Sequence, residues 1–358
     1  GLGTVGVGIV RIVQKHAELL EKRAGRPVVI TAVSARSKTK NRDVDLSDYA
    51  WEDDPVHLAK RTDIDVFIEV MGGSEGPAKD ATEAAIAAGH DVVSANKALL
   101  AIHGQSIAEA AEAKGCVVRF EAAVAGGIPV VKALTEGLAG NEITRVMGVM
   151  NGSCNYILTR MENDGMTYEE VFDAANQLGY LEADPELDVG GIDAGHKLAL
   201  LASIAFGTQV NFDAVALEGI GSITIEDIHQ AADMGYKIKL LGVAQMTGRG
   251  LEQRMQPCLV PDTSPLGQLQ GGTNMLVLEG DAVGQIPHGA PISATTDVAT
   301  DAGGCFNGHG VPGVDFLRCR DMVHADTGWE AADDERAVPS PGSGKALLPG
   351  HRPRQHRE

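Results

Sequence analysis

The chain has 358 residues, of which 44% are apolar and 22% are charged, an ordinary balance for a globular protein of two domains. Its 49 acidic side chains outnumber the 30 basic ones and give a formal net charge of -19. A surface of that charge repels phosphate backbones and anionic lipid, so we expect no nucleic-acid and no membrane partner. The sequence holds no run of about eighteen apolar residues and no apolar leader, and we therefore expect a cytoplasmic protein.

The first six residues, GLGTVG, form a glycine run that leads into an apolar-periodic segment at about 7–20, which we predict to be a helix. A GxGxxG run before a helix is typical of dinucleotide-binding proteins, because its glycines let the main chain approach a pyrophosphate at a positively polarised helix end. The strand that normally precedes such a run has no counterpart here, so we expect a sheet without it. The residues predicted to bind the cofactor are Gly1, Gly3, Thr4, Val5 and Gly6.

Short β-branched runs alternate with alanine-rich segments as far as residue 120. The predicted strands are 27–34, 65–70, 90–94 and 116–120, and the predicted helices between them include 78–89 and 105–115. Strands that alternate with helices predict an α/β fold, here a Rossmann-like doubly wound parallel sheet. We assign this NAD(P)-binding domain to residues 1–126.

The pattern changes at about Gly127. Strand-like runs at 143–150 and 240–246 surround long predicted helices, such as 168–179 and 192–206, which favours a second, α+β domain for substrate and dimerisation at 127–286. Beyond it, Leu, Ile, Val and Phe make up only 11 of the last 72 residues, fewer than a packed core needs. We therefore expect 287–358 to be a divergent and mostly disordered tail.

The end of the second predicted strand bears on cofactor choice. Proteins selective for NAD usually carry a carboxylate there, whereas this chain has Arg36 and Lys38. Both side chains could pair with a 2′-phosphate, which a carboxylate would repel. NADP is therefore the expected cofactor, with NAD as the alternative.

A dense group of carboxylates precedes a very apolar helix. Asp193 and Lys197 are four residues apart and share one face of that helix, and the segment 198–206 has no charge. Although most such pairs are surface salt bridges, a pair that faces a core is costly and is more often kept where a reaction uses it. A lysine beside a carboxylate can transfer the proton that accompanies hydride transfer, and Glu182 and Asp188 could bind a substrate ammonium.

Two further segments follow predicted strands. Lys97 comes just after the strand 90–94, at the edge where open α/β sheets bind ligands, so it is placed to meet cofactor or substrate. The segment 121–129, EAAVAGGIP, is a glycine-containing turn whose carbonyls could surround a hard monovalent cation. Taken by itself, however, the turn is better interpreted as a domain hinge.

Over residues 1 to 286 the chain resembles homoserine dehydrogenase. The motifs that carry the resemblance are GLGTVG, SANKALL at 94–100, EAAVAGGIPV at 121–130, NGSCNYILTRM at 151–161 and GYLEADPELDVGGIDAGHKLALLASIAFG at 179–207. The last is the most specific, because several acids, glycines and a lysine recur at fixed spacing. The chain departs from the family at Ser153-Cys154, at Gly195 and beyond Ile286.

The resemblance implies NAD(P)-dependent interconversion of L-aspartate 4-semialdehyde and L-homoserine, a step of threonine, methionine and isoleucine biosynthesis. It implies that Lys197 is the proton donor or acceptor, that Asp193 orients it, and that Lys97 lies beside substrate and nicotinamide. Glu182 and Asp188 would bind homoserine's polar groups, and a homodimer or homotetramer is expected. The implied sodium ligands are Glu121 and the carbonyls of Val124, Gly126 and Ile128.

Two other interpretations remain open at this point. The segment 152–155, GSCN, is similar to the nucleophile turn of acylating semialdehyde dehydrogenases, in which Cys154 would be the reactive thiolate. Alternatively, the chain is a truncated and inactive copy of an enzyme.

Overall fold

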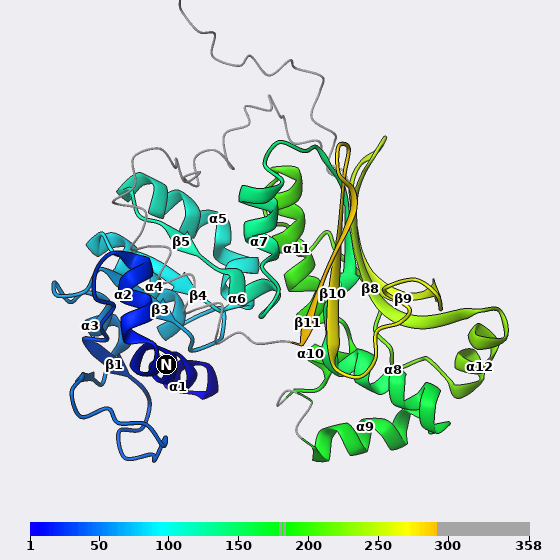
Figure 1. The fold of residues 1–358 in the computed structure, drawn as a ribbon, viewed down its shortest axis with the longest axis horizontal. Coiled ribbons are helices and arrows are strands. Elements are labelled where there is room, and N and C mark those ends of the chain that lie inside the picture. Colours follow the sequence, from blue (N-terminus) through cyan, green and yellow to red (C-terminus); the bar gives the residue numbers. More distant parts are fainter. Residues whose placement is uncertain (179–180, 182–183, 292–358) are drawn as a thin grey trace, which may run out of the picture.

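The computed structural model describes residues 1–178, 181 and 184–291, which form two domains that lie side by side (Figure 1). The predicted substrate residue Glu182 and the tail expected beyond residue 291 lie outside the described residues. Among the described residues, no helix is long and apolar enough to cross a membrane.

Parallel strands form the sheets of the first domain. The predicted strands at 65–70, 90–94 and 116–120 are confirmed as β3 (Val66–Glu69), β4 (Asp91–Ser94) and β5 (Val118–Arg119), which form one sheet in that order. A second, two-stranded sheet holds β1 (Ala32–Ser34) and β2 (Ala50–Glu52). The parallel pairing confirms the predicted α/β class.

Helices α1 (Thr4–Lys15) and α2 (Ala17–Ala24) precede these strands, and α3 (Pro55–Ala59), α4 (Pro77–Ala88) and α5 (Lys97–Lys114) connect them. The prediction of one helix over 7–20 is wrong, because the chain leaves helical geometry at His16. On one side of this break α1 buries four residues against the sheets, whereas α2 buries none. Only α1 therefore has an apolar face that packs against the sheets, and the helix breaks where this face ends.

A cavity of about 220 Å³ is lined by residues of both parallel sheets, among them residues of β1 and β3. Helix α1 contacts both, since Ile9 packs in the cluster of β3 and β4 while Val10 packs with Val33 of β1. Only the last three residues of the predicted strand 27–34 are a strand, because only they have a partner, β2. Side chains of α1 thus join the two sheets. Among the described residues, no hydrogen-bonded ladder connects β1 with β3.

A six-stranded sheet forms the second domain, in the order β11-β10-β6-β8-β9-β7. Its neighbours are antiparallel except for β7 and β9. The strands are β6 (Ile143–Val149), β7 (Ala216–Leu217), β8 (Tyr236–Thr247), β9 (Gly250–Pro261), β10 (Thr273–Gly280) and β11 (Gly284–Pro291). Sequence patterning found only β6 and the central part of β8. Strand β7 has only two residues, and β9 and β11 mix charged residues, proline or glycine with few aliphatics.

Strand β11 also corrects the predicted end of this domain. Its pairing with β10 runs from Gly284 to Pro291, five residues beyond Ile286. The segment GQIPHGAP has little aliphatic content because it forms the edge of the sheet, where composition is a weak signal. The predicted tail therefore begins too early.

Helix α11 (Ile192–Phe206) lies between the six-stranded sheet and the first domain (Figure 1) and has the predicted bounds. Its side chains at Leu198 and Leu201 are fully buried, as its lack of charge indicates. The remaining helices of this part are α6 (Glu121–Val124), α7 (Val130–Lys132), the π-helix η1 (Ala133–Gly137), α8 (Gly152–Asp164), α9 (Tyr168–Gln177), α10 (Glu186–Val189) and α12 (Ile225–Asp233).

Candidate active site

Two lysines and one carboxylate meet where the domains adjoin. The Asp193 carboxylate receives Lys197 Nζ at 2.7 Å on Oδ2 and Lys97 Nζ at 2.9 Å on Oδ1. Lys197 lies one turn further along α11, whereas Lys97 is the first residue of α5 in the other domain. The structure thus brings together three residues that the sequence predicts to be catalytic.

The charge on Asp193 is held by these two cations. The carboxylate is 5% exposed, and burial by itself raises the pKa of a carboxyl group. Attraction to Lys197 and Lys97 overrides burial, and the pKa of Asp193 falls well below its ordinary value of 3.8. Asp193 therefore remains an anion and cannot itself be the group that exchanges a proton near neutral pH.

The start of α11 is set by Gly191, which has a φ of 81°, a left-handed geometry that favours glycine. The turn directs the chain into the helix so that Asp193 lies in its first turn, where the helix dipole stabilises a negative charge. Lys197 Nζ also donates to the carbonyl of Met150 at 2.9 Å. This carbonyl at the end of β6 and the carboxylate together fix the direction of the lysine.

Asn151 connects the two acids of the site. Its side chain caps α8 by accepting from the Cys154 amide at 2.8 Å. Its amide nitrogen donates to Asp188 Oδ1 at 2.8 Å and to Asp193 Oδ2 at 3.2 Å. Asp188 is 3% exposed and lies in the same cleft, so the predicted substrate-binding carboxylate is brought close to the lysine centre.

Lys97 is positioned by a buried polar network at the ends of β3 and β4. Ser94 Oγ donates to Glu69 Oε2 at 2.8 Å and accepts from the Asn96 amide at 3.0 Å. Asn96 caps α5 by accepting from the Leu99 amide at 3.1 Å. Glu69 is fully buried and also accepts from the Met71 amide at 2.6 Å. This network fixes the first turn of α5, and Lys97 with it.

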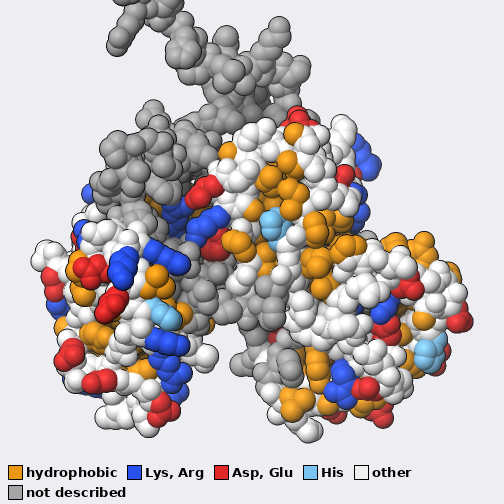
Figure 2. Space-filling model, in the orientation of Figure 1, with side chains coloured by type: hydrophobic (Ala, Val, Ile, Leu, Met, Phe, Trp, Pro, Cys, Tyr) orange, Lys and Arg blue, Asp and Glu red, His pale blue; other side chains and the backbone are white. Residues whose placement is uncertain are grey.

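Lys97, Asp193 and Lys197 line a cleft of about 380 Å³ between the domains. Two lobes separated by a notch are visible in the space-filling view (Figure 2). The lining combines hydrogen-bond donors and acceptors from both domains with several alanines and glycines. Its residues are Ala95, Lys97, Ala122, Ala123, Val124, Ala125, Gly126, Asn151, Gly152, Ser153, Asp188, Asp193, Lys197, Gly272 and Asn274.

The glycine run has the geometry of a turn that only glycine permits. A Cβ on Gly6 would lie 1.9 Å from the Gly1 carbonyl oxygen, and a Cβ on Gly1 would lie 2.8 Å from the Val70 oxygen. A Cβ on Gly3, by contrast, would meet no atom within 4 Å. Gly3 caps the first helix of the chain, so a phosphate could approach the main chain and the amides of Thr4 and Val5 from this open side.

Arg36 and Lys38 are exposed beyond the end of β1. Lys38 Nζ lies 5.9 Å from the ring centroid of Trp51 on β2. Arg42, which sequence patterning missed, donates to the carbonyl of Leu2 at 3.2 Å and to that of Ser37 at 2.6 Å. This arginine joins the basic loop to the glycine run, so the two predicted parts of the cofactor site are adjacent.

The glycine-containing turn after β5 is tied to α7. Glu121 is 2% exposed and accepts from the amides of Val131 at 2.7 Å and Lys132 at 3.0 Å. The Ile128 carbonyl accepts from the Val130 amide at 2.7 Å. Each of these oxygens has a second lone pair, so Glu121 and the Ile128 carbonyl remain chemically suitable as cation ligands. Among the described residues no group of three or more His, Cys, Asp or Glu could hold a metal, so a cation site here depends on carbonyls.

Sequence patterning missed two asparagines that line the cleft, Asn151 and Asn274, and also Asn96, which directly precedes the lining residue Lys97. Asn96 and Asn151 each precede a helix, and asparagine is a favoured N-cap residue, so this signal was available. Asn274 carries no such signal. It lies in β10, far along the chain from the acids, and only the sheet places it beside them.

The structure contradicts Cys154 as a nucleophile. Its side chain is fully buried, and its Sγ donates to the Asp188 carbonyl at 3.2 Å. Burial, followed by the nearby charges of Asp188 and Asp193, raises the pKa of this thiol far above its ordinary value. The alternative of an acylating semialdehyde dehydrogenase is therefore wrong, since that chemistry needs an accessible thiolate.

We expect Cys154 to resist alkylation in the native protein. With iodoacetamide at about pH 8, it should react at least about tenfold more slowly than the half-buried Cys258, because the thiolate is the reactive species. Mass spectrometry of peptides after timed quenching measures both rates. In denaturant the two rates should converge, and equal rates in the native protein would contradict the burial argument.

Comparison with known proteins gives a consistent result. Residues 1–121 match the family model "Homoserine dehydrogenase, NAD binding domain", and residues 129–299 match "Homoserine dehydrogenase". The homoserine dehydrogenase of Neisseria gonorrhoeae is 45% identical over 285 residues, which are 80% of this chain and 65% of the relative. The chain therefore spans somewhat less than two thirds of that relative's length.

Two further relatives are covered more fully. The homoserine dehydrogenase of Bacillus subtilis is 41% identical over 300 residues, which are 84% of this chain and 69% of the relative. The crystal structure of a homoserine dehydrogenase from Thiobacillus denitrificans superposes with a TM-score of 0.85 at 38% identity and covers 95% of this chain and 78% of that one. With the two-lysine centre and the glycine run in place, this chain belongs to the homoserine dehydrogenase family.

Proposed function

We propose that the chain interconverts L-homoserine and L-aspartate 4-semialdehyde with a nicotinamide cofactor. The observation that carries this proposal is the Asp193 carboxylate between Lys97 and Lys197, in a cleft open to both domains. Oxidation of an alcohol removes a hydride from carbon and a proton from oxygen. A bound nicotinamide would supply the hydride acceptor, and the residues of the cleft must supply the route for the proton.

Lys197 is the proposed proton carrier. Two of the three donors of its ammonium group point to Met150 O and Asp193 Oδ2, so the third can point to the reacting oxygen. In its neutral form the lysine accepts the hydroxyl proton of homoserine, and in its charged form it returns a proton to the aldehyde oxygen. Asp193 keeps its negative charge throughout and compensates the charge that appears on the lysine.

Lys97 and Asp188 are proposed to orient the substrate. Lys97 reaches the centre from the cofactor domain, so it can contact a substrate oxygen close to the nicotinamide. Asp188 offers a carboxylate to the substrate ammonium, and Glu182 is proposed as a second acid for that group. A substrate that spans these groups is a small amino acid with a terminal oxygen, which is the chemistry of homoserine.

NADP is the proposed preferred cofactor. The open side of Gly3 and the start of α1 suit a pyrophosphate, and Arg36 and Lys38 offer positive charge at the end of β1. Replacing Arg36 by Asp should lower kcat/KM for NADP about 10- to 100-fold and leave kcat/KM for NAD within about threefold, because the new carboxylate repels only the 2′-phosphate.

Initial-rate measurements with both cofactors test this expectation. Arg249→Asp is the matched control, since this arginine is 87% exposed in the turn between β8 and β9, in the other domain. It should leave both values unchanged. A wild-type preference for NAD that persists in Arg36→Asp would overturn the assignment of NADP.

The proposal also includes a metal ion, an oligomeric state, a location and a biosynthetic role. A sodium ion is proposed at Glu121 and the carbonyls of Val124, Gly126 and Ile128, where it would order the turn between the domains. A homodimer or homotetramer, a cytoplasmic location and a role in threonine, methionine and isoleucine biosynthesis complete the proposal. Multi-angle light scattering of the full chain measures its assembly.

The activity itself is tested with the full 358-residue chain. Reduction of NADP in the presence of L-homoserine, followed by absorbance, should be abolished when L-homoserine is omitted. Trapping of the aldehyde product with a hydrazine identifies it. A folded chain that binds NADP and L-homoserine but forms no aldehyde would refute the proposed activity.

A further inference from the structure

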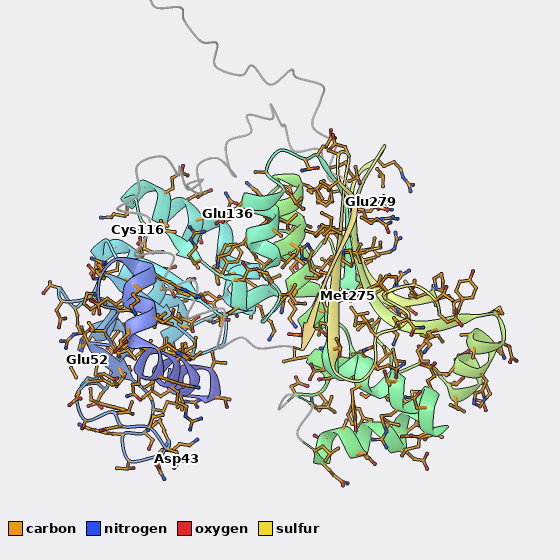
Figure 3. The ribbon with its side chains drawn as sticks, in the orientation of Figure 1. Asp43, Glu52, Cys116, Glu136, Met275 and Glu279 are labelled. Carbon is orange, nitrogen blue, oxygen red and sulfur yellow. The ribbon has the colours of Figure 1, made fainter. Side chains whose placement is uncertain are left out.

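Asn274 lies at the start of β10, beside the cleft but outside the group of residues discussed so far as catalytic. It directly precedes Met275, which Figure 3 labels on that strand. Its side chain is 2% exposed, yet it lines the same cleft as Lys97, Asp188 and Lys197. A polar side chain in such a position either has partners within the protein or waits for one from a ligand.

The side-chain oxygen of Asn274 is buried and accepts no hydrogen bond from the described residues. Asn151, another buried asparagine of the cleft, differs because it accepts from Cys154 and donates to both Asp188 and Asp193. A buried carbonyl without a donor is costly, and proteins rarely retain one without a reason. The cleft supplies the reason if a ligand brings the donor.

The main chain next to Asn274 is held firmly. Lys239, 1% exposed, donates to Asn155 Oδ1 at 2.9 Å and to the Leu269 carbonyl at 2.7 Å. Asn155 in turn donates to the carbonyls of Gly271 at 2.8 Å and Thr273 at 3.3 Å. This support positions Asn274 before any ligand binds, so little ordering would be lost on binding.

The chemistry of the cleft selects the ligand group. Lys97 and Lys197 are donors and match the oxygens of an amino-acid substrate, whereas Asn274 Oδ1 needs a donor. In homoserine the group that carries several donors and takes no part in the reaction is the α-ammonium. We propose that Asn274 accepts a hydrogen bond from the substrate α-ammonium and so selects 2-amino-4-hydroxy acids over their des-amino analogues, an inference that rests on the proposed function.

The test compares L-homoserine with 4-hydroxybutanoate, which lacks only the amino group. In Asn274→Leu, kcat/KM for L-homoserine should fall about 10- to 100-fold, the value of one hydrogen bond to a charged group, while that for 4-hydroxybutanoate should change less than about twofold. Asn274→Asp keeps an acceptor and should restore most of the preference for L-homoserine. A purely structural role would lower both substrates alike, and that result would overturn the proposal.

Thr208→Val is the matched control, because Thr208 Oγ1 is also buried and has no hydrogen-bond partner within the described part of the chain, but lies outside the cleft. It should leave the ratio of the two kcat/KM values unchanged.

Calorimetric measurement of the binding of L-homoserine and 4-hydroxybutanoate separates this proposal from the proposed activity. If the wild-type chain binds L-homoserine without turning it over, the proposed function fails, and the ratio of the two dissociation constants in Asn274→Leu still decides the role of Asn274. If the wild-type chain binds no L-homoserine, both fail.

Discussion

Lys197→Ala is expected to lower kcat for L-homoserine about 10²–10⁴-fold, the usual contribution of a general acid–base group. The Kd for NADP should stay within about twofold, because Lys197 contacts Asp193 and the Met150 carbonyl rather than the glycine run. Steady-state kinetics and cofactor titration by fluorescence measure the two quantities. The combination of a large loss of kcat with intact cofactor binding separates a proton-transfer role from loss of the fold.

Lys237→Ala is the matched control for this experiment. Lys237 also pairs with a carboxylate, Glu162, at 2.9 Å, but it lies on β8 away from the cleft. Its replacement should leave kcat within about twofold, because neither Lys237 nor Glu162 lines the cleft. A near-normal kcat in Lys197→Ala would make its pair with Asp193 structural, and the proton route would then have to be sought at Lys97.

Asp193→Asn is expected to lower the free energy of unfolding by about 2–4 kcal/mol. Loss of one partner from a fully buried ion pair costs about 3–5 kcal/mol, because a charge is left without compensation. The expected value is smaller here, since the side chains of Lys197 and Lys97 are 14% and 29% exposed and water screens part of their repulsion. Urea unfolding followed by circular dichroism measures the difference from wild type.

The pH dependence of this difference has a definite sign. The pKa of Asp193 is lowered in the folded protein from an ordinary value of 3.8, so the carboxylate contributes stability above that value. The contribution is lost as the pH falls through the lower, folded pKa. The gap between wild type and Asp193→Asn should therefore be constant above about pH 5 and shrink below about pH 4.

Asp164→Asn provides the comparison, because Asp164 also pairs with a basic residue four positions away, Arg160, but on an exposed helix face. Its loss should cost less than about 0.5 kcal/mol. If Asp193→Asn cost no more than Asp164→Asn, the buried carboxylate would not be what holds the two lysines together.

The sequence by itself determined the parts of this protein that depend on local patterns. Alternation of β-branched and alanine-rich runs predicted β3, β4 and β5, and the uncharged stretch after Lys197 predicted the bounds of α11. The glycine run was recognisable because its spacing reflects close contacts such as that of Gly6 with Gly1. The Asp193–Lys197 pair was recognisable because one helical turn joins its members.

Only the tertiary structure decided which distant residues meet. Lys97 and Asp193 belong to different domains, and no local pattern places them 2.9 Å apart. Much of the sheet of the second domain could not be predicted, since β9 and β11 are stabilised by their ladders and neighbours rather than by their own composition. No local pattern predicts that Asn274 lies in the cleft, because the pairing of the strands places it there. The burial that excludes Cys154 as a nucleophile likewise depends on tertiary packing: α8 packs against α10, and Cys154 Sγ donates to the Asp188 carbonyl.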